Sequence, residues 1–450
     1  MENNIKEGQA WLLSLPQLTD GFQVSEGGKD SQAIVAVLDN AESLERDGYL
    51  KRLSEKGFSI ISEYSLGGNE YALLNGYRAT VYLSYLRAAK KLKIYAEPKG
   101  VTKYPSSEPC GYEAIKDYEP TLWQMNVDSK CALSYMKDLP KGRQGANGGM
   151  CYIMRVADGS FVIIDSGYHT KKQATDIFEL LKENSPEECP VISAWIFTHV
   201  DGDHIMGFQT FTDMYADWVK IKGFYLNFPE SSWEKIREAI EKYPDAVVYR
   251  GLQAGMRFYI ADARFDVIYS YCDRYFSGVE LSPEKCKKPL CRVGSDTNND
   301  SLVFRVTLGG QRIMFLGDVE MEGSKIIEKN IDICELRSDI VQYSHHGWDG
   351  AEASLYDKIA APTVLWPINV YSWQHNCYGE NIFNRLISRR TDKYCYYSVN
   401  YYIAHEAEYV KTVIIHGEGT AKLFLPYTPR SNRLPDHNTI FDRIAKAHEI

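Results

Sequence analysis

Two histidines and two aspartates lie within six consecutive positions, as His199, Asp201, Asp203 and His204. They directly follow the apolar run 191–197, so they stand in a turn at the end of a predicted buried strand. Imidazoles and carboxylates spaced this closely suit a divalent metal ion. The alternative is a polar turn whose carboxylates cap the next helix. Because four such side chains rarely cluster by chance, the metal site is the favoured interpretation.

Two further predicted strands also end in possible metal ligands. The strand 312–316 is followed by Gly317-Asp318, and the strand 340–343 is followed by Ser344-His345-His346-Gly347. In α/β enzymes, functional side chains gather where strands end. We therefore expect these residues to meet the 199–204 cluster in space, with one of the two histidines as ligand and the other near the substrate or a transferred proton.

The composition describes an ordinary globular chain and excludes several classes of function. With 450 residues, two domains are expected. A net charge of -9 argues against a strong nucleic-acid footprint. The longest apolar runs are too short to span a membrane, and residues 1–7 lack a signal-peptide pattern. Ten cysteines without a CxxC pair fit reduced thiols and a cytoplasmic location. The oligomeric state is not indicated.

The pattern along the chain predicts an α/β (α+β) fold in two domains. Residues 1–98 read as a small N-terminal α+β domain, with a docking, substrate-shaping or purely structural role. Residues 99–120 are Pro-rich, which predicts a linker. Strands and helices alternate through 121–428, which we take as the catalytic domain, and 429–450 reads as a tail. Within the larger domain, 251–299 has weak periodicity and reads as a long insertion or lid.

At this point the chain resembles the metallo-β-lactamase superfamily, whose first motif is H-x-H-x-D-H. Here the motif stands as H-x-D-x-D-H, which is similar to the branch containing the metallo-hydrolase domain of the bacterial DNA-uptake channel protein. Four further stretches are similar to the same family: Asp165-Ser166-Gly167, Asn298-Asn299-Asp300-Ser301-Leu302-Val303, Phe315-Leu316-Gly317-Asp318 and His345-His346-Gly347. The resemblance covers roughly residues 121–428.

The resemblance implies an αββα metallo-β-lactamase sandwich with the metal site at one edge of the sheets. Asp318 would bridge two ions, although an ordinary helix-starting aspartate is the alternative. The family's separate third histidine is missing, since no histidine occurs between His204 and His345, and Asn298 or Asn299 stands near that place. The resemblance implies one or two Zn²⁺ ions, because zinc is the usual metal of the superfamily. Mn²⁺ or Fe²⁺ is the alternative, because the expected ligands include several carboxylates.

Such a centre would activate water for hydrolysis. We expect a small-molecule or phosphorylated substrate, with a phosphodiester favoured by the branch resemblance. The rivals are hydrolysis of an ester, lactone or amide, and an inactive binding or scaffold protein. The expected metal ligands are His199, Asp201, Asp203, His204, Asp318, His345 and His346. The expected catalytic residues are Asp203, His346 and His375, and the expected substrate-binding residues are Asn298, Asn299 and His375.

Overall fold

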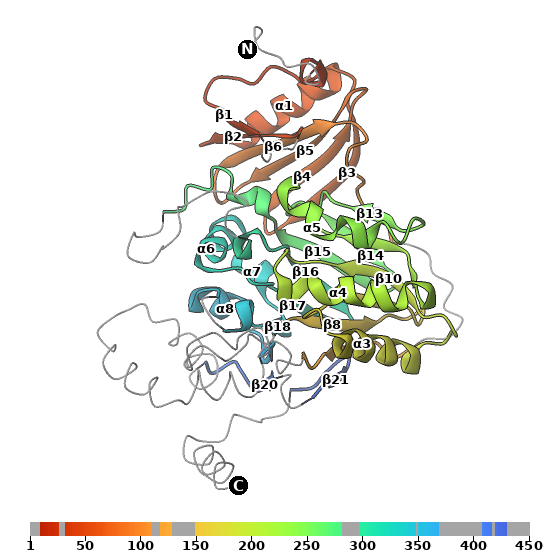
Figure 1. Cartoon of the computed structure of the whole chain (residues 1–450). Helices are drawn as coiled ribbons and strands as arrows, with labels where there is room; N and C mark the ends of the chain where they lie inside the picture. Colours follow the sequence, from red (N-terminus) through yellow and green to blue (C-terminus); the bar gives the residue numbers. More distant parts are fainter. Residues whose placement is uncertain are drawn as a thin grey trace, which may run out of the picture.

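The computed structural model describes residues 10–26, 32–109, 118–127, 149–280, 297–347, 350–368, 407–415 and 419–429. Within these residues the strands form three sheets, and helices lie against their outer faces (Figure 1). No helix in this part of the chain is long and apolar enough to cross a membrane.

The first sheet is antiparallel and has the order β1-β2-β6-β5-β4-β3. Its strands are β1 (Gln23–Glu26), β2 (Ile34–Asp39), β3 (Ser59–Leu66), β4 (Asn69–Asn75), β5 (Ala79–Leu86) and β6 (Lys91–Pro98). Helix α1 (Ser43–Glu55) covers one face, where Tyr49 and Leu53 pack against Ala36 and Leu74.

The opposite face of this sheet packs onto the rest of the chain. Tyr71, Tyr82 and Tyr95 belong to the large apolar core of the two following sheets. The Tyr82 hydroxyl donates to the carbonyl of Ala254 at 2.9 Å, and Lys93 forms a buried ion pair with Asp273. The N-terminal unit therefore shares its core with the second and third sheets. Whether it folds separately, as a domain over 1–98, stays a prediction.

The second sheet joins a parallel half to an antiparallel half, in the order β13-β12-β10-β9-β8-β7-β21, with β11 (Lys220–Ile221) paired to β10. The strands are β7 (Thr121–Gln124), β8 (Cys151–Arg155), β9 (Phe161–Asp165), β10 (Val191–Ile196), β12 (Gly223–Tyr225), β13 (Val247–Tyr249) and β21 (Ala421–Phe424). Helices α3 (Lys171–Asn184), α4 (Gly202–Tyr215) and α5 (Glu230–Ile240) bury their apolar faces against its outer side.

The third sheet has the order β14-β15-β16-β17-β18-β19-β20, antiparallel up to β17 and parallel beyond it. The strands are β14 (Arg257–Ile260), β15 (Ala263–Tyr269), β16 (Val303–Leu308), β17 (Gln311–Phe315), β18 (Ile340–Gln342), β19 (Thr363–Trp366) and β20 (Thr412–Ile415). Its outer face is covered by α6 (Met321–Asn330), α7 (Ile333–Leu336) and α8 (Ala353–Ile359) (Figure 1).

The interpretation of 251–299 as an insertion or lid is wrong for its central part. Residues 257–269 form β14 and β15, which complete the third sheet and contribute Phe258, Phe265 and Val267 to the core. A register shift between Val267 and Tyr269 breaks the alternation of β15, and its partner strand β16 lies far along the chain. Both features weaken the local signal on which sequence reasoning depends.

The second and third sheets pack face to face and give four layers: helices, sheet, sheet, helices. Tyr152 of β8 meets Phe315 of β17 with ring centroids 5.2 Å apart, and Tyr225 stacks on Phe258 at 4.9 Å. In each sheet the parallel strands end at the same edge, since β9 runs parallel to β10 and β17 runs parallel to β18. The side chains that follow these four strands can therefore meet.

Candidate metal centre

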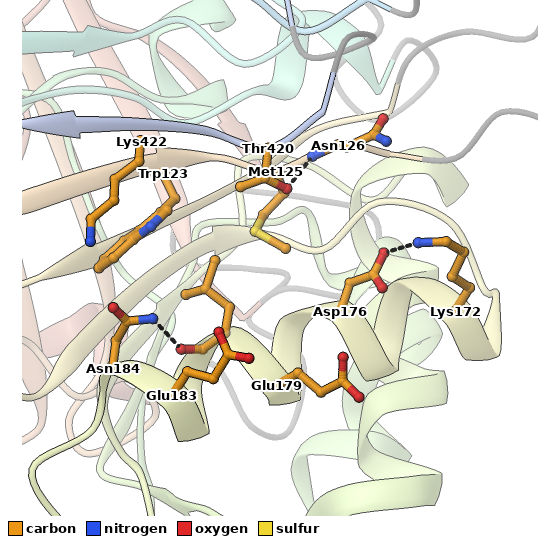
Figure 2. A pocket seen from close by; sticks show the side chains of 11 residues that line it. Trp123, Met125, Asn126, Lys172, Asp176, Glu179, Glu183, Asn184, Thr420 and Lys422 are labelled. Atoms are coloured by element: carbon orange, nitrogen blue, oxygen red, sulfur yellow. Dashed lines mark hydrogen bonds and ion pairs between the residues drawn. The ribbon is translucent and has the colours of Figure 1, made fainter.

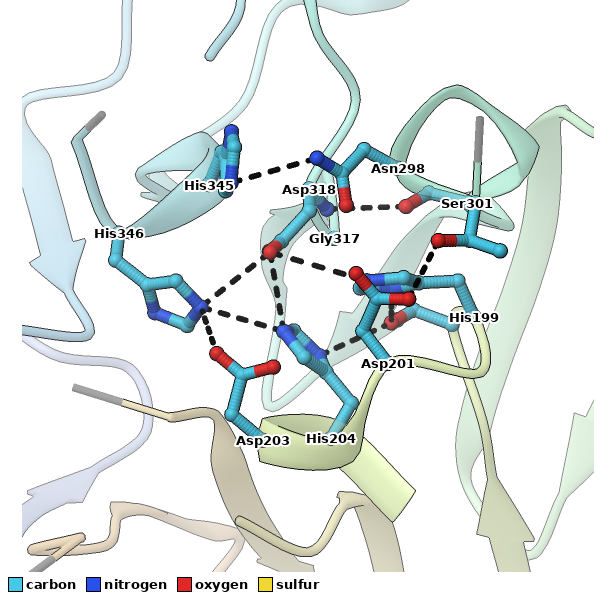
Figure 3. Close-up of polar contacts among 12 residues, drawn as sticks. His199, Asp201, Asp203, His204, Asn298, Ser301, Gly317, Asp318, His345 and His346 are labelled. Atoms are coloured by element: carbon cyan, nitrogen blue, oxygen red, sulfur yellow. Dashed lines mark hydrogen bonds and ion pairs between the residues drawn. The ribbon is translucent and has the colours of Figure 1, made fainter. Parts of the chain in front are cut away.

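Residues that follow β10, β17 and β18 converge on one point (Figure 3). Oδ2 of Asp318 lies 3.1 Å from Nε2 of His204, 3.3 Å from Nε2 of His346 and 3.8 Å from Nε2 of His199. The two nitrogens of His204 and His346 are 3.3 Å apart. With metal–ligand bonds of about 2.0–2.1 Å, tetrahedral ligand atoms lie about 3.3 Å from one another. The spacing therefore matches that of ligands around one ion.

Each of the three imidazoles has its second nitrogen held by an acceptor. Nδ1 of His204 donates to the Asp165 carboxylate at 2.7 Å, and Nδ1 of His346 donates to the carbonyl of Pro367 at 2.8 Å. Nδ1 of His199 lies 3.1 Å from the Thr198 hydroxyl, which itself donates to Asp165. Because these partners assign the proton to Nδ1, each Nε2 presents its lone pair to the centre. This arrangement is typical of metal-ligating histidines.

The pKa shifts of the buried carboxylates and imidazoles in the cluster also favour a bound cation. Burial opposes ionisation, but the bond to His346 and the charges of His204 and His346 hold the pKa of Asp203 below its usual range. The same two imidazoles hold the pKa of Asp318 well below its usual range, again against the effect of burial. Burial would lower the pKa of His346, but the charges of Asp318 and Asp203 raise it to about 10. A divalent ion can balance these carboxylates in place of protons.

Two atoms at the centre have no hydrogen-bond partner among the described residues. They are Nε2 of His199 and Oδ1 of Asp318, and both side chains are almost fully buried. A buried polar atom left without a partner costs about 1–3 kcal/mol. Both atoms offer lone pairs in a cluster of donors suited to a divalent ion, so the residues present fit a metal ion.

Helix α4 is placed by close contacts at its first two turns. Ser166 donates to the carbonyl of His204 at 2.6 Å. A Cβ at Gly207 would lie 2.0 Å from the carbonyl oxygen of Ser166, so only glycine allows this approach. Asp201 occupies the N-cap position but its side chain makes no capping hydrogen bond; it accepts from Thr297 instead. The alternative of a merely helix-capping turn therefore does not describe Asp201.

Asp318 likewise does not start a helix. Helix α6 begins at Met321 with Glu320 as its N-cap. The backbone N–H of Asp318 donates to the hydroxyl of Ser301 at 3.0 Å, and its carboxylate faces the three imidazoles.

The structure distinguishes His345 from His346. Both residues adopt left-handed backbone, with φ of 49° and 51°, which non-glycine residues rarely do. The turn sends His346 into the centre, 3.3 Å from Asp203, and sends His345 toward the amide of Asn298 at 3.4 Å and the carboxylate of Glu320 at 3.6 Å. His346 therefore has the geometry of a ligand, whereas His345 lies at the rim.

The segment 297–302 supports the centre from one side. Thr297 donates to Asp201, and the N–H of Leu302 donates to the carbonyl of Thr198 at 2.8 Å. The segment is itself fixed from behind, because the buried Arg274 pairs with Asp300 at 2.6 Å and with Glu322 at 3.0 Å. The segment 297–302 is thus held against Thr198 and Asp201 on one side of the site. On the other side, its residue Ser301 accepts the N–H of Asp318.

The remaining expected site residues have different positions. Asp201 lies outside the two tight groups of possible ligands, which are His199, His204 and Asp318, and Asp203, His204 and His346; its Oδ2 is 3.9 Å from Nε2 of His199. Asn299 is buried, and its side-chain oxygen accepts the N–H groups of Glu320 and Gly323. His375 lies outside the described residues.

Sequence reasoning did not assign Asp165 and Thr198 a role in the site. Asp165 ends β9 in a left-handed conformation (φ 55°) and accepts from the N–H and hydroxyl of Thr198 as well as from His204. The available signal was that Asp165 is another polar residue at the end of a buried strand. Its function depends on a residue 39 positions away, which no local pattern identifies.

A separate shallow pocket of about 520 Å³ lies between α3 and the paired strands β7 and β21 (Figure 2). Trp123 and Lys422 line one side of it, and the acidic residues Asp176, Glu179 and Glu183 of α3 line the other. None of the residues of the candidate centre lines this pocket, so it is a feature distinct from the metal-binding cluster.

No protein-family model and no curated protein matches this chain. Among solved structures, it is similar to a diphosphatase from the PhnP family, with 15% identity, 55% of this chain and 85% of that chain covered, and a TM-score of 0.32. It is also similar to the metallo-β-lactamase fold protein YhfI from Bacillus subtilis, with 10% identity, 55% of this chain and 85% of that chain covered, and a TM-score of 0.33. The short form of human tRNase Z is similar with 12% identity, 54% of this chain and 90% of that chain covered, and a TM-score of 0.27.

Proposed function

We propose that this chain is a metal-dependent hydrolase of the metallo-β-lactamase superfamily, acting on a small phosphodiester or related phosphorylated substrate. One observation carries the hydrolase part of the proposal. Three buried imidazoles turn their Nε2 lone pairs toward two carboxylates, and each imidazole is locked in that orientation through Nδ1. The four-layer arrangement and the ordered motifs around residues 199–204, 318 and 346 support the superfamily.

A divalent ion, with zinc as the first choice, would supply Lewis acidity toward water and toward the substrate oxygen. Asp203, His204, His346 and Asp318 would hold it. Asp203 turns its Oδ2 toward Nε2 of His346 at 3.3 Å, so its carboxylate would lie beside the ion and could orient the attacking water. His345 stands at the rim and is partly exposed, which suits contact with the substrate.

The substrate class rests on weaker support than the chemistry. The H-x-D-x-D-H form of the first motif favours a phosphodiester through its branch resemblance. The net charge of -9 favours a small phosphorylated molecule over a long nucleic acid. His375, which lies outside the described residues, stays a proposed contact of the substrate.

The experiment measures metal content and hydrolysis on the same samples. Protein purified without chelators is assayed for bound metal and tested on bis-p-nitrophenyl phosphate, p-nitrophenyl acetate and a simple lactone. We expect metal in the protein and turnover of the phosphodiester that chelator abolishes. Turnover of the ester or lactone alone would overturn the substrate class, and bound metal without any turnover would favour a binding protein.

Asp203→Ala provides the matched test, with Asp213→Ala as its control on the same helix. Asp213 is exposed and pairs only with Lys242 among the described contacts, so its loss should leave metal content and rate unchanged. Asp203→Ala should lower metal affinity by more than about 100-fold, because even outer-shell losses reach that value. An active, metal-containing Asp203→Ala protein would overturn the mechanism.

A further inference from the structure

A series of buried charged side chains runs from the first sheet toward the candidate metal centre. It begins at Lys93 of β6 and continues through the consecutive residues Asp273 and Arg274 to Asp300 and Glu322. All five residues are less than one-tenth exposed. Buried ion pairs often add little stability compared with apolar residues of similar size, because desolvation offsets their attraction. These pairs are therefore better explained by the positions that they fix than by the stability that they add.

The link between the two ends of this series is the short 3-10 helix η3 (Tyr271–Arg274). One carboxylate oxygen of Asp273 pairs with Lys93, and the other accepts the N–H of Ser270 at 2.9 Å. Both oxygens of Asp273 are thus fixed. Because Arg274 is the next residue in the same short turn, a displacement of Asp273 also moves the Arg274 guanidinium. The position of Arg274 therefore depends on Lys93.

Arg274 and its strand hold the segment 297–302. Nη1 of Arg274 donates to Asp300 at 2.6 Å, which is a charge-assisted hydrogen bond between two buried groups. The hydroxyl of Tyr269, at the end of β15, donates to the carbonyl of Asn299 at 2.5 Å. The residues on either side of η3 thus contact two consecutive residues of this segment, and the turn that Lys93 holds is joined to it directly.

The same segment contacts the residues of the centre. Thr297 donates to Asp201 at 2.5 Å, and the hydroxyl of Ser301 accepts the N–H of Asp318 at 3.0 Å (Figure 3). Asn298, which the sequence predicts as a substrate contact, stands between Thr297 and Ser301 in the chain. An unbroken series of contacts therefore connects the first sheet with the centre.

We propose that Lys93 is a positioning residue of the candidate centre, and that the first sheet sets the place of the segment 297–302 through Asp273 and Arg274. Lys93 contacts no reacting group and acts only through this series. The N-terminal unit thereby shapes the site instead of merely covering the core. The effect on turnover rests on the proposed function, whereas the coupling between the first sheet and the segment does not.

The experiment measures amide hydrogen exchange by mass spectrometry on the full chain and its Lys93→Met variant. The N–H groups of residues 300–302 donate to backbone carbonyls, among them that of Thr198, so their exchange reports whether the segment stays in place. Lys93→Met should accelerate their exchange by about 10-fold more than that of β8 and β9, the factor expected for typical coupling between residues of one ion-pair network.

A second substitution tests whether Lys93 acts through Arg274. If it does, adding Lys93→Met to Arg274→Met should not accelerate exchange of residues 300–302 any further. Independent effects would multiply instead, and this result would overturn the proposal. If either methionine variant does not fold, Lys93→Gln keeps a donor for Asp273, and Arg274→Lys keeps the charge but loses the forked geometry of the guanidinium.

Tyr82→Phe is the matched control on the same face of the first sheet. The Tyr82 hydroxyl donates to the carbonyl of Ala254 at 2.9 Å and is no part of the series. Its loss should affect residues 300–302 no more than β8 and β9. A general loss of stability accelerates exchange in all of these segments alike. An equal rise in all of them for Lys93→Met, or no rise at all, would contradict the positioning role.

Metal content and hydrolysis of bis-p-nitrophenyl phosphate are measured on the same samples. Lys93→Met removes no proposed ligand, so it should keep the bound metal. Its turnover should fall by about 10–100-fold, because displacing a site residue by about 1 Å reaches the upper value. Wild-type turnover despite accelerated exchange of residues 300–302 would overturn the role in catalysis. If the unmodified chain shows neither metal nor turnover, the proposed function fails, while the exchange data still decide the coupling.

Discussion

The Asp165 carboxylate accepts a hydrogen bond from Nδ1 of His204 at 2.7 Å, across 39 positions of sequence. The same carboxylate accepts the N–H of Thr198 at 2.8 Å and the Thr198 hydroxyl at 2.6 Å, and that hydroxyl lies next to Nδ1 of His199. One buried carboxylate therefore orients two of the three imidazoles, directly in one case and through Thr198 in the other.

Asp165→Asn should weaken metal binding while leaving every proposed ligand in place. Asparagine has one acceptor oxygen, so its NH₂ group must face either the Thr198 N–H or Nδ1 of His204, and one of these contacts becomes repulsive. We expect the dissociation constant of the tightest ion to rise by about 10–100-fold, measured by competition with a chelator. Asp158→Asn is the control, since Asp158 bonds only to Ser160 among the described contacts. An unchanged constant for Asp165→Asn would contradict this role.

His346→Ala and His345→Ala should differ sharply in metal content. Both residues adopt left-handed backbone, so each alanine variant carries a similar backbone strain and the pair is matched. His346→Ala removes a nitrogen 3.3 Å from Oδ2 of Asp318 and should lose the bound ion. His345→Ala should keep the ion and lower turnover only. Metal analysis and rates on the same preparations test this, and equal metal loss in both variants would be inconsistent with the structure.

A chain truncated to residues 118–450 should not reach the native state. Removing the first sheet exposes the large core where Tyr71, Tyr82 and Tyr95 pack, and it leaves the buried Asp273 without Lys93. The smaller change Lys93→Met should already destabilise the full chain by about 3 kcal/mol, because removing one partner of a buried ion pair leaves an unpaired charge. Urea unfolding curves measure the stability of the truncated chain and of the Lys93→Met variant. A truncated chain that unfolds cooperatively at the wild-type midpoint would support an independent domain.

Glu97→Gln should stabilise the protein more at pH 8 than at pH 5. Burial raises the pKa of Glu97 above its ordinary value of 4.5, although hydroxyl groups of Thr102, Tyr104 and Tyr95 donate to it and oppose the shift. A carboxyl group with a raised pKa favours folding while protonated, so its contribution to stability falls as the pH rises through that pKa. Glutamine removes this dependence.

Urea midpoints at the two pH values give the difference between Glu97→Gln and the wild type. Glu108→Gln at an exposed position is the control and should show no such trend. A difference for Glu97→Gln that stays constant between pH 5 and pH 8 would contradict the account.

The amino-acid sequence determined which side chains could bind metal and where the main elements lie. Local information was sufficient for this, because spacing within 199–204 and the apolar runs before Asp318 and His345 are properties of short segments. At β15 a register shift interrupts the alternation, so the local pattern does not indicate a strand there, and the interpretation of this segment as an insertion or lid was wrong.

The tertiary structure alone decided the roles within that set. His345 and His346 are neighbours in sequence, and only the left-handed turn after β18 separates a ligand geometry from a rim position. Asp165 contacts His204 across 39 positions of sequence, and Asn298 contacts His345 across 47 positions. Such contacts depend on the packing of two sheets and the ends of four strands, and hydrogen-bond geometry at that range is not encoded in any local period.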